Sequence, residues 1–230
     1  MGLIGPNGAG KTTVFNLLSG VLKPSAGDIF FNSENITAFS PAQTARAGIA
    51  RTFQNIKLFG DLCVLDNIKV AFHMRHGSGF LNTICHTAKF RQTEKKITRN
   101  AMKFAEMMNL TDLIYEPAKK LPYGDQRRME IARALATDPK LLLLDEPAAG
   151  MNTQETIELV TTIKNIHANQ EITILIVEHD MRLVMNLCRH IQVLDQGRVL
   201  AEGTPEQIQN SPEVIKAYLG SPKETVHADS

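Results

Sequence analysis

The 230-residue sequence has only three cysteines and no long hydrophobic run. Cys63, Cys85 and Cys188 are odd in number and form no C-x-x-C pair. This argues against a disulfide framework or a zinc site and favours a reducing compartment. The longest apolar runs, Leu141 to Leu144 and Ile172 to Val177, are far shorter than the roughly 20 residues that span a bilayer. We therefore expect no direct membrane span, so any work at a membrane would go through another chain.

An excess of charge of either sign is also missing, because the formal net charge is +1. Proteins that bind nucleic acid usually carry a basic surface, so we expect no nucleic-acid partner. The richest basic stretch, Lys89 to Arg99, is interrupted by Glu94, and this favours a solvated helix face. With 43% hydrophobic residues, the chain can form one domain with a sizeable core, or one domain with a small subdomain.

What the sequence does contain is a match to the phosphate-loop pattern G-x-x-x-x-G-K-[ST], almost at its first residue. Glycines permit close backbone approach to a triphosphate, Lys11 can reach its β- and γ-phosphates, and Thr12 can bind Mg²⁺. An ordinary glycine turn before a surface helix is the alternative. The apolar stripe that follows at helical spacing favours the phosphate loop. The candidate nucleotide-binding residues here are Gly5, Pro6, Asn7, Gly8, Ala9, Gly10, Lys11, Thr12 and Thr13.

A second candidate element is the leucine run followed by Asp145 and Glu146. Four consecutive leucines predict a strand buried on both faces, and open α/β sheets bind ligands at the carboxyl ends of their strands. Asp145 would hold Mg²⁺, directly or through water, and Glu146 would act as general base on the attacking water. Taken alone, such a pair is more often a turn or a helix cap. A phosphate loop in the same chain reverses that preference.

Strand and helix signals alternate along most of the chain, which predicts an α/β fold with a mostly parallel sheet covered by helices on both faces. Between about residues 60 and 137 only helices are indicated, so we expect an inserted helical subdomain. The catalytic core would comprise 1–59 and 138–220, and 221–230 would be a polar tail. Strands are expected at 28–32, 49–54, 141–144, 172–178 and 191–194, with a turn at 196–197, and helices at 64–74, 87–108, 125–136, 154–168 and 181–188.

Three further motifs, in order, resemble those of the nucleotide-binding subunit of ATP-binding cassette (ABC) transporters, a family of P-loop NTPases. Arg51-Thr52-Phe53-Gln54 resembles the glutamine loop, the segment 121–128 resembles the signature motif, and Val177-Glu178-His179-Asp180 resembles the histidine switch. The resemblance covers Gly2 to about Gly220 and implies an ATPase that uses ATP and Mg²⁺. It implies that Gln54 contacts Mg²⁺ and the catalytic water, and that His179 contacts the γ-phosphate. Taken alone, a glutamine in a loop or a histidine after a strand is usually an ordinary surface residue without a functional role.

The signature motif implies a site shared between two chains. Gly124 and the N-terminus of the helix after it would stabilise the γ-phosphate of ATP bound to the opposite subunit, with Tyr123 and Asp125 beside it. The sequence departs from the usual Leu-Ser-Gly-Gly-Gln: Pro122 replaces the serine, Tyr123 a glycine and Asp125 the glutamine. Without the other motifs, this segment would be interpreted as a plain turn before a helix.

Finer resemblance is to the ATP-binding subunits of bacterial branched-chain amino acid importers. It lies in Leu-Pro-Tyr-Gly at 121–124, in the segment 146–152, in Glu-His-Asp-Met at 178–181 and in the segment 215–220. It implies membrane permease subunits as partners, a peripheral place at the cytoplasmic face of the inner membrane, and a second ATPase subunit, a heterodimer being favoured over a homodimer. We expect the permease to contact a groove near Gln54 to Asp66.

Three alternatives remain open: a lipopolysaccharide-type exporter ATPase, which would normally show aspartate where Asn152 stands; a soluble cassette of DNA repair or translation; and a truncated cassette that binds its permease without turnover. ABC cassettes also place two or three strands, with an aromatic residue that stacks on adenine, before the phosphate loop. Nothing before Gly5 supplies them. We therefore hypothesise a truncated chain, or a misassigned start at Met1.

Overall fold

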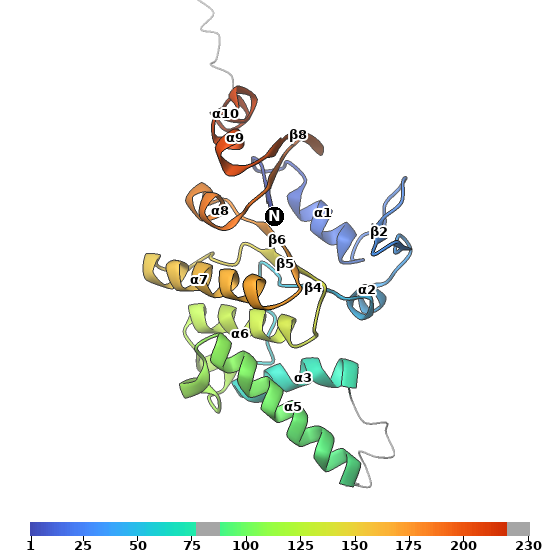
Figure 1. Ribbon diagram of the computed structural model, residues 1–230, viewed down its shortest axis with the longest axis vertical. Coiled ribbons are helices and arrows are strands. Elements are labelled where there is room, and N and C mark those ends of the chain that lie inside the picture. The colour runs from blue at the N-terminus through green and yellow to red at the C-terminus, as the bar shows by residue number, and fades with distance from the viewer. Residues whose placement is uncertain (77–87, 220–230) are drawn as a thin grey trace, which may run out of the picture.

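The computed structural model describes residues 1–76 and 88–219 (Figure 1). Its main element is a six-stranded sheet in the order β4-β5-β6-β1-β7-β8, in which all pairs are parallel except β7 with β8. The mostly parallel sheet predicted from the sequence is therefore confirmed. The strands, in chain order, are β1 (Gly2–Ile4), β4 (Ile49–Arg51), β5 (Leu141–Asp145), β6 (Thr173–Val177), β7 (Ile191–Asp195) and β8 (Arg198–Gly203).

Helices pack on both faces of this sheet. Leu143 packs with Leu3 and Phe15 on the α1 side, whereas Leu142 and Leu144 pack with Leu159 of α7 on the other side. The leucine run is thus buried on both faces, as the absence of any polar residue in it predicts. The remaining helices around the sheet are α1 (Lys11–Leu18), α2 (Pro41–Ala47), α7 (Thr153–Asn169), α8 (Met181–Leu187), α9 (Pro205–Gln209) and α10 (Pro212–Leu219).

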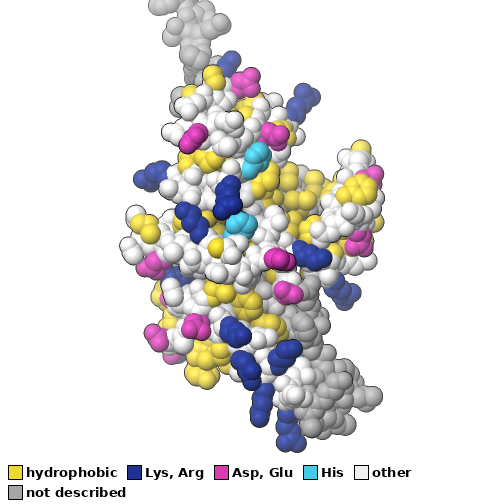
Figure 2. All heavy atoms as spheres, viewed as in Figure 1, with side chains coloured by type: hydrophobic (Ala, Val, Ile, Leu, Met, Phe, Trp, Pro, Cys, Tyr) yellow, Lys and Arg dark blue, Asp and Glu magenta, His cyan; other side chains and the backbone are white. Residues whose placement is uncertain are grey.

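A group of helices occupies one end of the molecule, at the bottom of Figure 1. It consists of α3 (Val64–His76), α5 (Ala88–Met107) and α6 (Tyr123–Leu135), with short 3₁₀ turns η1 (Thr111–Leu113) and η2 (Ala118–Lys120). Lys and Arg side chains gather over this end in Figure 2. On α5 the exposed ones include Lys95, Lys96 and Arg99, consistent with the predicted solvated face. No helix in the described ranges is both long enough and apolar enough to cross a bilayer.

Several element boundaries differ from the expected ones. The strand expected at 28–32 has two residues, β2 (Phe30–Phe31), and pairs with β3 (Glu34–Asn35) in a separate antiparallel sheet. Asn32 and Ser33 both take positive φ, 48° and 67°, in its tight two-residue turn, and three of its four strand residues are exposed, so little burial stabilises a longer hairpin. The helix expected from Asp125 starts two residues earlier, with Pro122 as N-cap. The predicted turn at 196–197 is confirmed between β7 and β8.

Candidate functional site

Four neighbouring parallel strands, β4, β5, β6 and β1, end at the same edge of the sheet. The segments after them are those that the sequence motifs single out: Gln54 follows β4, Glu146 follows β5, His179 follows β6, and the phosphate loop follows β1. The pairing of Asp145 with Val177 aligns the ends of β5 and β6. The topology therefore collects residues that are far apart in the chain at the edge where such sheets bind ligands.

The phosphate loop is shaped for an anion. Gly5, Gly8 and Gly10 have positive φ, and a Cβ on Gly5 would lie 2.1 Å from the Leu194 carbonyl oxygen, so no side chain fits there. Gly10 is the N-cap of α1, whose first turn carries no acidic residue. Free N–H groups and a positive helix dipole end at this point favour a phosphate.

Lys11 is folded back over the loop. Its Nζ donates hydrogen bonds to the carbonyl oxygens of Gly5, at 2.7 Å, and Pro6, at 3.0 Å. Burial lowers the pKa of the Lys11 ammonium, and the carboxylates of Glu146 and Asp145 oppose that shift. A cation held in this way stands ready to exchange carbonyl oxygens for phosphate oxygens.

Beside the loop lies a hollow of about 290 Å³. Gln54 and Glu146 line it together with the phosphate loop, and Gln54 Nε2 lies 3.4 Å from Glu146 Oε2. The structure thus brings together the two residues that sequence analysis gave to the catalytic water. The complete lining is Asn7, Gly8, Ala9, Gly10, Lys11, Thr12, Thr13, Gln54, Glu146 and Val177.

Glu146 has a left-handed backbone, with φ of 46°, which is rare outside glycine. Its N–H still donates to the Val177 carbonyl at 2.9 Å, so the chain turns sharply at the end of β5 without losing this bond. Such local strain tends to occur at functional sites. His179 Nδ1 lies 3.7 Å from Glu146 Oε1, and the His179 side chain is 70% exposed. The imidazole therefore stands at the rim of the site.

Asp145 lies deeper than Glu146 and does not line the hollow. Its Oδ2 accepts a hydrogen bond from Arg51 Nη2 at 2.8 Å, and both side chains are buried. Sequence analysis gave Arg51 no role. Because a buried carboxylate needs a cationic or hydrogen-bonding partner, the sequence does predict some partner for Asp145. It does not indicate which cationic residue that partner is. Thr12, Gln54 and Asp145 each carry an oxygen of the kind that Mg²⁺ prefers, and the first two line the hollow.

The predicted signature residues lie outside the hollow of their own chain. A Cβ on Gly150 would lie 2.8 Å from Tyr123 Cε1, and one on Gly124 would lie 2.9 Å from Glu155 Oε1. The start of α6 is therefore packed against the segment between β5 and α7 and against the first turn of α7. Asp125 is 3.3 Å from Arg128 in the same helix. These residues do not meet the phosphate loop within one chain.

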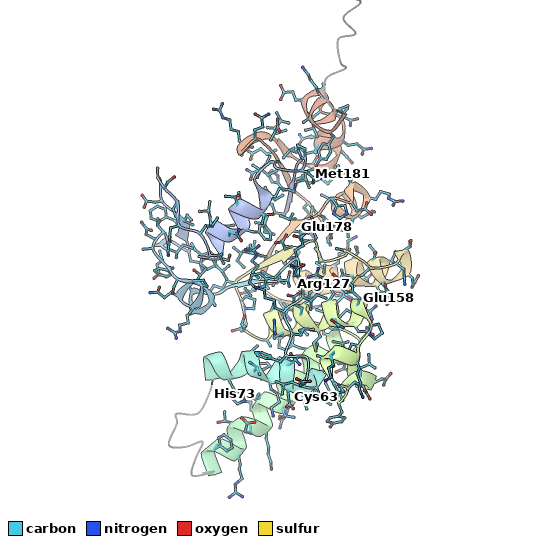
Figure 3. All side chains as sticks on the ribbon, turned by 180° about the vertical axis from the view of Figure 1, so that it is seen from behind. Cys63, His73, Arg127, Glu158, Glu178 and Met181 are labelled. Carbon is cyan, nitrogen blue, oxygen red and sulfur yellow. The ribbon has the colours of Figure 1, made fainter. Side chains whose placement is uncertain are left out.

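Arg127 is a second residue that sequence analysis quoted without a role. It is fully buried in α6 and donates to the carbonyl oxygens of Phe53, at 2.6 Å, and Gln54, at 2.9 Å (Figure 3). Glu130 balances its charge at 2.8 Å. The backbone of the glutamine loop is thus hydrogen-bonded to the same helix whose N-terminus carries Tyr123 and Gly124, so the two motifs are directly joined.

Comparison with protein families gives two matches. Residues 1–149 match the model described as "ABC transporter", and residues 198–224 match the one described as "Branched-chain amino acid ATP-binding cassette transporter". Among curated proteins, the chain is 46% identical over 95% of its length, and 86% of theirs, to the high-affinity branched-chain amino acid transport ATP-binding proteins BraF of Pseudomonas aeruginosa and LivG of Escherichia coli.

Solved structures agree with these matches. A nucleotide-free ATP-binding cassette from an ABC transporter shares 33% identity with a TM-score of 0.80, over 95% of this chain and 87% of that one. The ADP conformation of the cassette MJ1267 shares 31% identity with a TM-score of 0.78, over 96% and 87%. The architecture, the convergent site and both sequence comparisons lead to one assignment: the chain belongs to the ATP-binding cassette family of transporters, as an ATP-binding subunit.

Proposed function

We propose that this chain binds ATP with Mg²⁺, hydrolyses it, and thereby energises a membrane importer of branched-chain amino acids. The observation that carries the proposal is the hollow where the phosphate loop, Gln54 and Glu146 meet. The choice of branched-chain amino acids as cargo is supported by the relatives, which are ATP-binding proteins of branched-chain amino acid transport. No residue of this chain would contact the amino acid, because a cassette supplies energy and its membrane partners supply specificity.

We assign the catalytic roles from the family resemblance, and the surroundings of Glu146 support them. Its carboxylate accepts the proton of the attacking water as general base, Gln54 orients that water, and His179 contacts the γ-phosphate. Lys11 exchanges its bonds to the loop carbonyls for bonds to the β- and γ-phosphates. Asp145, Gln54 and Thr12 would hold the metal. When bound, Mg²⁺ supplies neutralisation of charge on the phosphates.

The partner in catalysis is a second cassette. Tyr123, Gly124 and Asp125 do not line the hollow of their own chain, and the N-terminus of α6, where they lie, would face the γ-phosphate of a nucleotide bound to an opposing chain. ATP then joins the two chains, and hydrolysis releases them. We propose a related but different cassette as this partner, that is, a heterodimer.

The permease would dock in a groove of about 690 Å³ between the sheet and the helices at the end of the molecule. Lys57, Leu58 and Phe59, within the segment expected to make this contact, line it together with the neighbouring Phe53. Phe59 is 51% exposed, and exposed apolar surface of this kind marks interaction sites. We propose that residues 60–137 act as a helical subdomain beside a core of 1–59 and 138–220, and that docking holds the chain at the cytoplasmic face of the inner membrane.

The alternatives differ from this proposal in what they predict. An exporter ATPase would hydrolyse ATP but purify with other membrane subunits. A non-catalytic cassette would bind its permease with no turnover. A soluble cassette of DNA repair or translation would need no permease. The names of the relatives favour the importer.

A direct test uses Glu146→Gln, in which hydrolysis is blocked and the ATP complex should persist. The variant is mixed with ATP, alone and with the candidate second cassette, and association is followed by light scattering. ATP-dependent dimers with either partner support the proposal, and a dimer of the chain with itself alone corrects the heterodimer to a homodimer. The exposed Glu171→Gln serves as the control, and its dimers should disperse as ATP is consumed. A folded chain that neither binds nor hydrolyses ATP in any combination would refute the proposal.

A further inference from the structure

Glu178 is a buried carboxyl group to which the roles above assign nothing. Its side chain is 1% exposed, and it lies in the middle of the molecule at the end of β6 (Figure 3). Within residues 1–76 and 88–219, its ion pairs are limited to the His179 ring, so no lysine or arginine compensates it. Burial raises the pKa of Glu178, Glu146 adds to the shift, and hydrogen bonds from Ala148 and His179 oppose it. A buried carboxyl without a cation costs stability, so plain packing does not account for it.

The two oxygens of Glu178 hold two different segments of the site. Oε1 accepts a hydrogen bond from the N–H of Ala148, at 2.9 Å, in the loop after β5. Oε2 accepts one from the N–H of His179, at 3.3 Å, and lies 3.9 Å from Nδ1 of the same residue. Because Glu146 Oε1 is 3.7 Å from that nitrogen, the Nδ1 edge of the ring faces two carboxylates. This leaves the Nε2 edge for a phosphate.

We propose that Glu178 is a positioning residue for ATP hydrolysis, which fixes His179 and the loop at Ala148 relative to one another so that the imidazole meets the γ-phosphate. The inference rests on the ATPase function proposed above. It gives the loop between β5 and α7, which packs against Tyr123 through Gly150, a direct connection to the histidine. A shift of that loop would therefore displace His179.

Glu178→Gln tests this arrangement because it preserves shape but not hydrogen-bonding capacity. A carboxylate accepts on both oxygens, whereas an amide offers one acceptor and one NH₂ donor. If the amide oxygen keeps the Ala148 N–H, the NH₂ group faces the His179 N–H, donor against donor. One of the two contacts must therefore be lost. Glu171→Gln removes an equal charge from an exposed position before β6 and is the matched control.

The experiment uses the whole chain and two readouts that need no activity. The ring ¹⁵N resonances of His179, assigned with His179→Ala, should shift in Glu178→Gln because one carboxylate neighbour of Nδ1 becomes neutral. The amide of Ala148 should exchange with solvent faster in Glu178→Gln or Glu178→Ala. Glu171→Gln should change neither. If Glu178→Gln does not fold, Glu178→Asp, which keeps the charge but withdraws both oxygens, takes its place.

Turnover supplies the third readout. We expect kcat for ATP to fall about ten- to hundredfold in Glu178→Gln, as for a misplaced catalytic group, with the affinity for ATP unchanged. Unchanged resonances together with unchanged exchange would overturn the inference, and so would an unchanged kcat in a variant whose His179 signals have moved. A wild-type chain without turnover, even with its partners, would refute the proposed ATPase instead, and the two spectroscopic readouts would still decide how Glu178 acts on His179.

Discussion

Replacing Arg51 with methionine should be among the most damaging single changes in this chain. The guanidinium joins the phosphate-loop helix to the end of β5. Nη1 donates to Asn16 at 2.6 Å and Ser19 at 3.1 Å, and Nη2 donates to Asp145 at 2.8 Å. The rings of Phe15 and Phe53 have their centroids 5.5 and 5.1 Å from its central carbon.

The magnitude follows from what Arg51→Met leaves behind. The Asp145 side chain is 6% exposed, and loss of the partner of a buried charge costs about 3–5 kcal/mol. Two cation–π contacts add about 0.5–1 kcal/mol each. Among the residues that the structure describes, Arg51 Nε finds no hydrogen-bond partner, so its removal recovers about 1 kcal/mol. We expect a net loss of about 3–6 kcal/mol, which corresponds to a thermal midpoint lower by about 6–24 °C.

Thermal unfolding of three variants tests this reasoning. In Arg51→Met with Asp145→Asn, the uncompensated charge is gone, so the double variant should be more stable than Arg51→Met alone. Lys119→Ala breaks the exposed pair with Asp61 and should leave the midpoint unchanged. A fall of less than about 2 °C in Arg51→Met, or a double variant no better than the single one, would refute the argument.

Three further changes have defined outcomes. Gly5→Ala should unfold the chain or lower its midpoint far more than Gly8→Ala, because a Cβ meets the Leu194 carbonyl at Gly5 and open space at Gly8; equal midpoints would contradict this. Lys11→Ala should weaken ATP binding at least tenfold by fluorescence titration without lowering the midpoint, and unchanged affinity would count against its role. The pKa of Glu178 is raised in the folded state, so its stabilising effect is complete below about pH 4.5 and is lost as pH rises through the raised value. The midpoint of wild type relative to Glu178→Gln should therefore rise as the pH falls from 7 to about 4.5, and a difference that stays constant over this range would disprove the assignment.

The parts of this fold that sequence predicted are those set by local pattern. No polar residue interrupts the four leucines of β5, so the sequence predicts that this strand is buried on both faces. The glycines of the phosphate loop and Lys11 specify their chemistry within a few residues. Gln54 and His179 are single polar residues without local pattern, and only resemblance to a family assigned them roles.

The remaining features depend on contacts between distant residues. The partner of Asp145 is Arg51, which lies far away in sequence, and nothing near either residue indicates the pairing. Arg127 and Glu178 form hydrogen bonds with backbone atoms of other segments. Every residue type offers the same backbone carbonyl, and nearly every type the same N–H group, so the sequence does not indicate which residue is the partner. The tight turn that ends β2 depends on the positive φ of Asn32 and Ser33, which asparagine and serine do not by themselves require.

The central place of β1 has a consequence for synthesis on the ribosome. Its three residues pair with β6 and β7, Gly2 opposite Ile176 and Ile191, although they leave the ribosome well before either of these strands. At about 5–20 residues per second, the strand waits roughly 10–40 s for its neighbours. Until then the nascent phosphate loop lacks the Leu194 carbonyl against which Gly5 closes. Nucleotide therefore cannot assist folding of the nascent chain before nearly the whole domain has been made, and a premature stop before β7 would leave a product that no ligand can rescue.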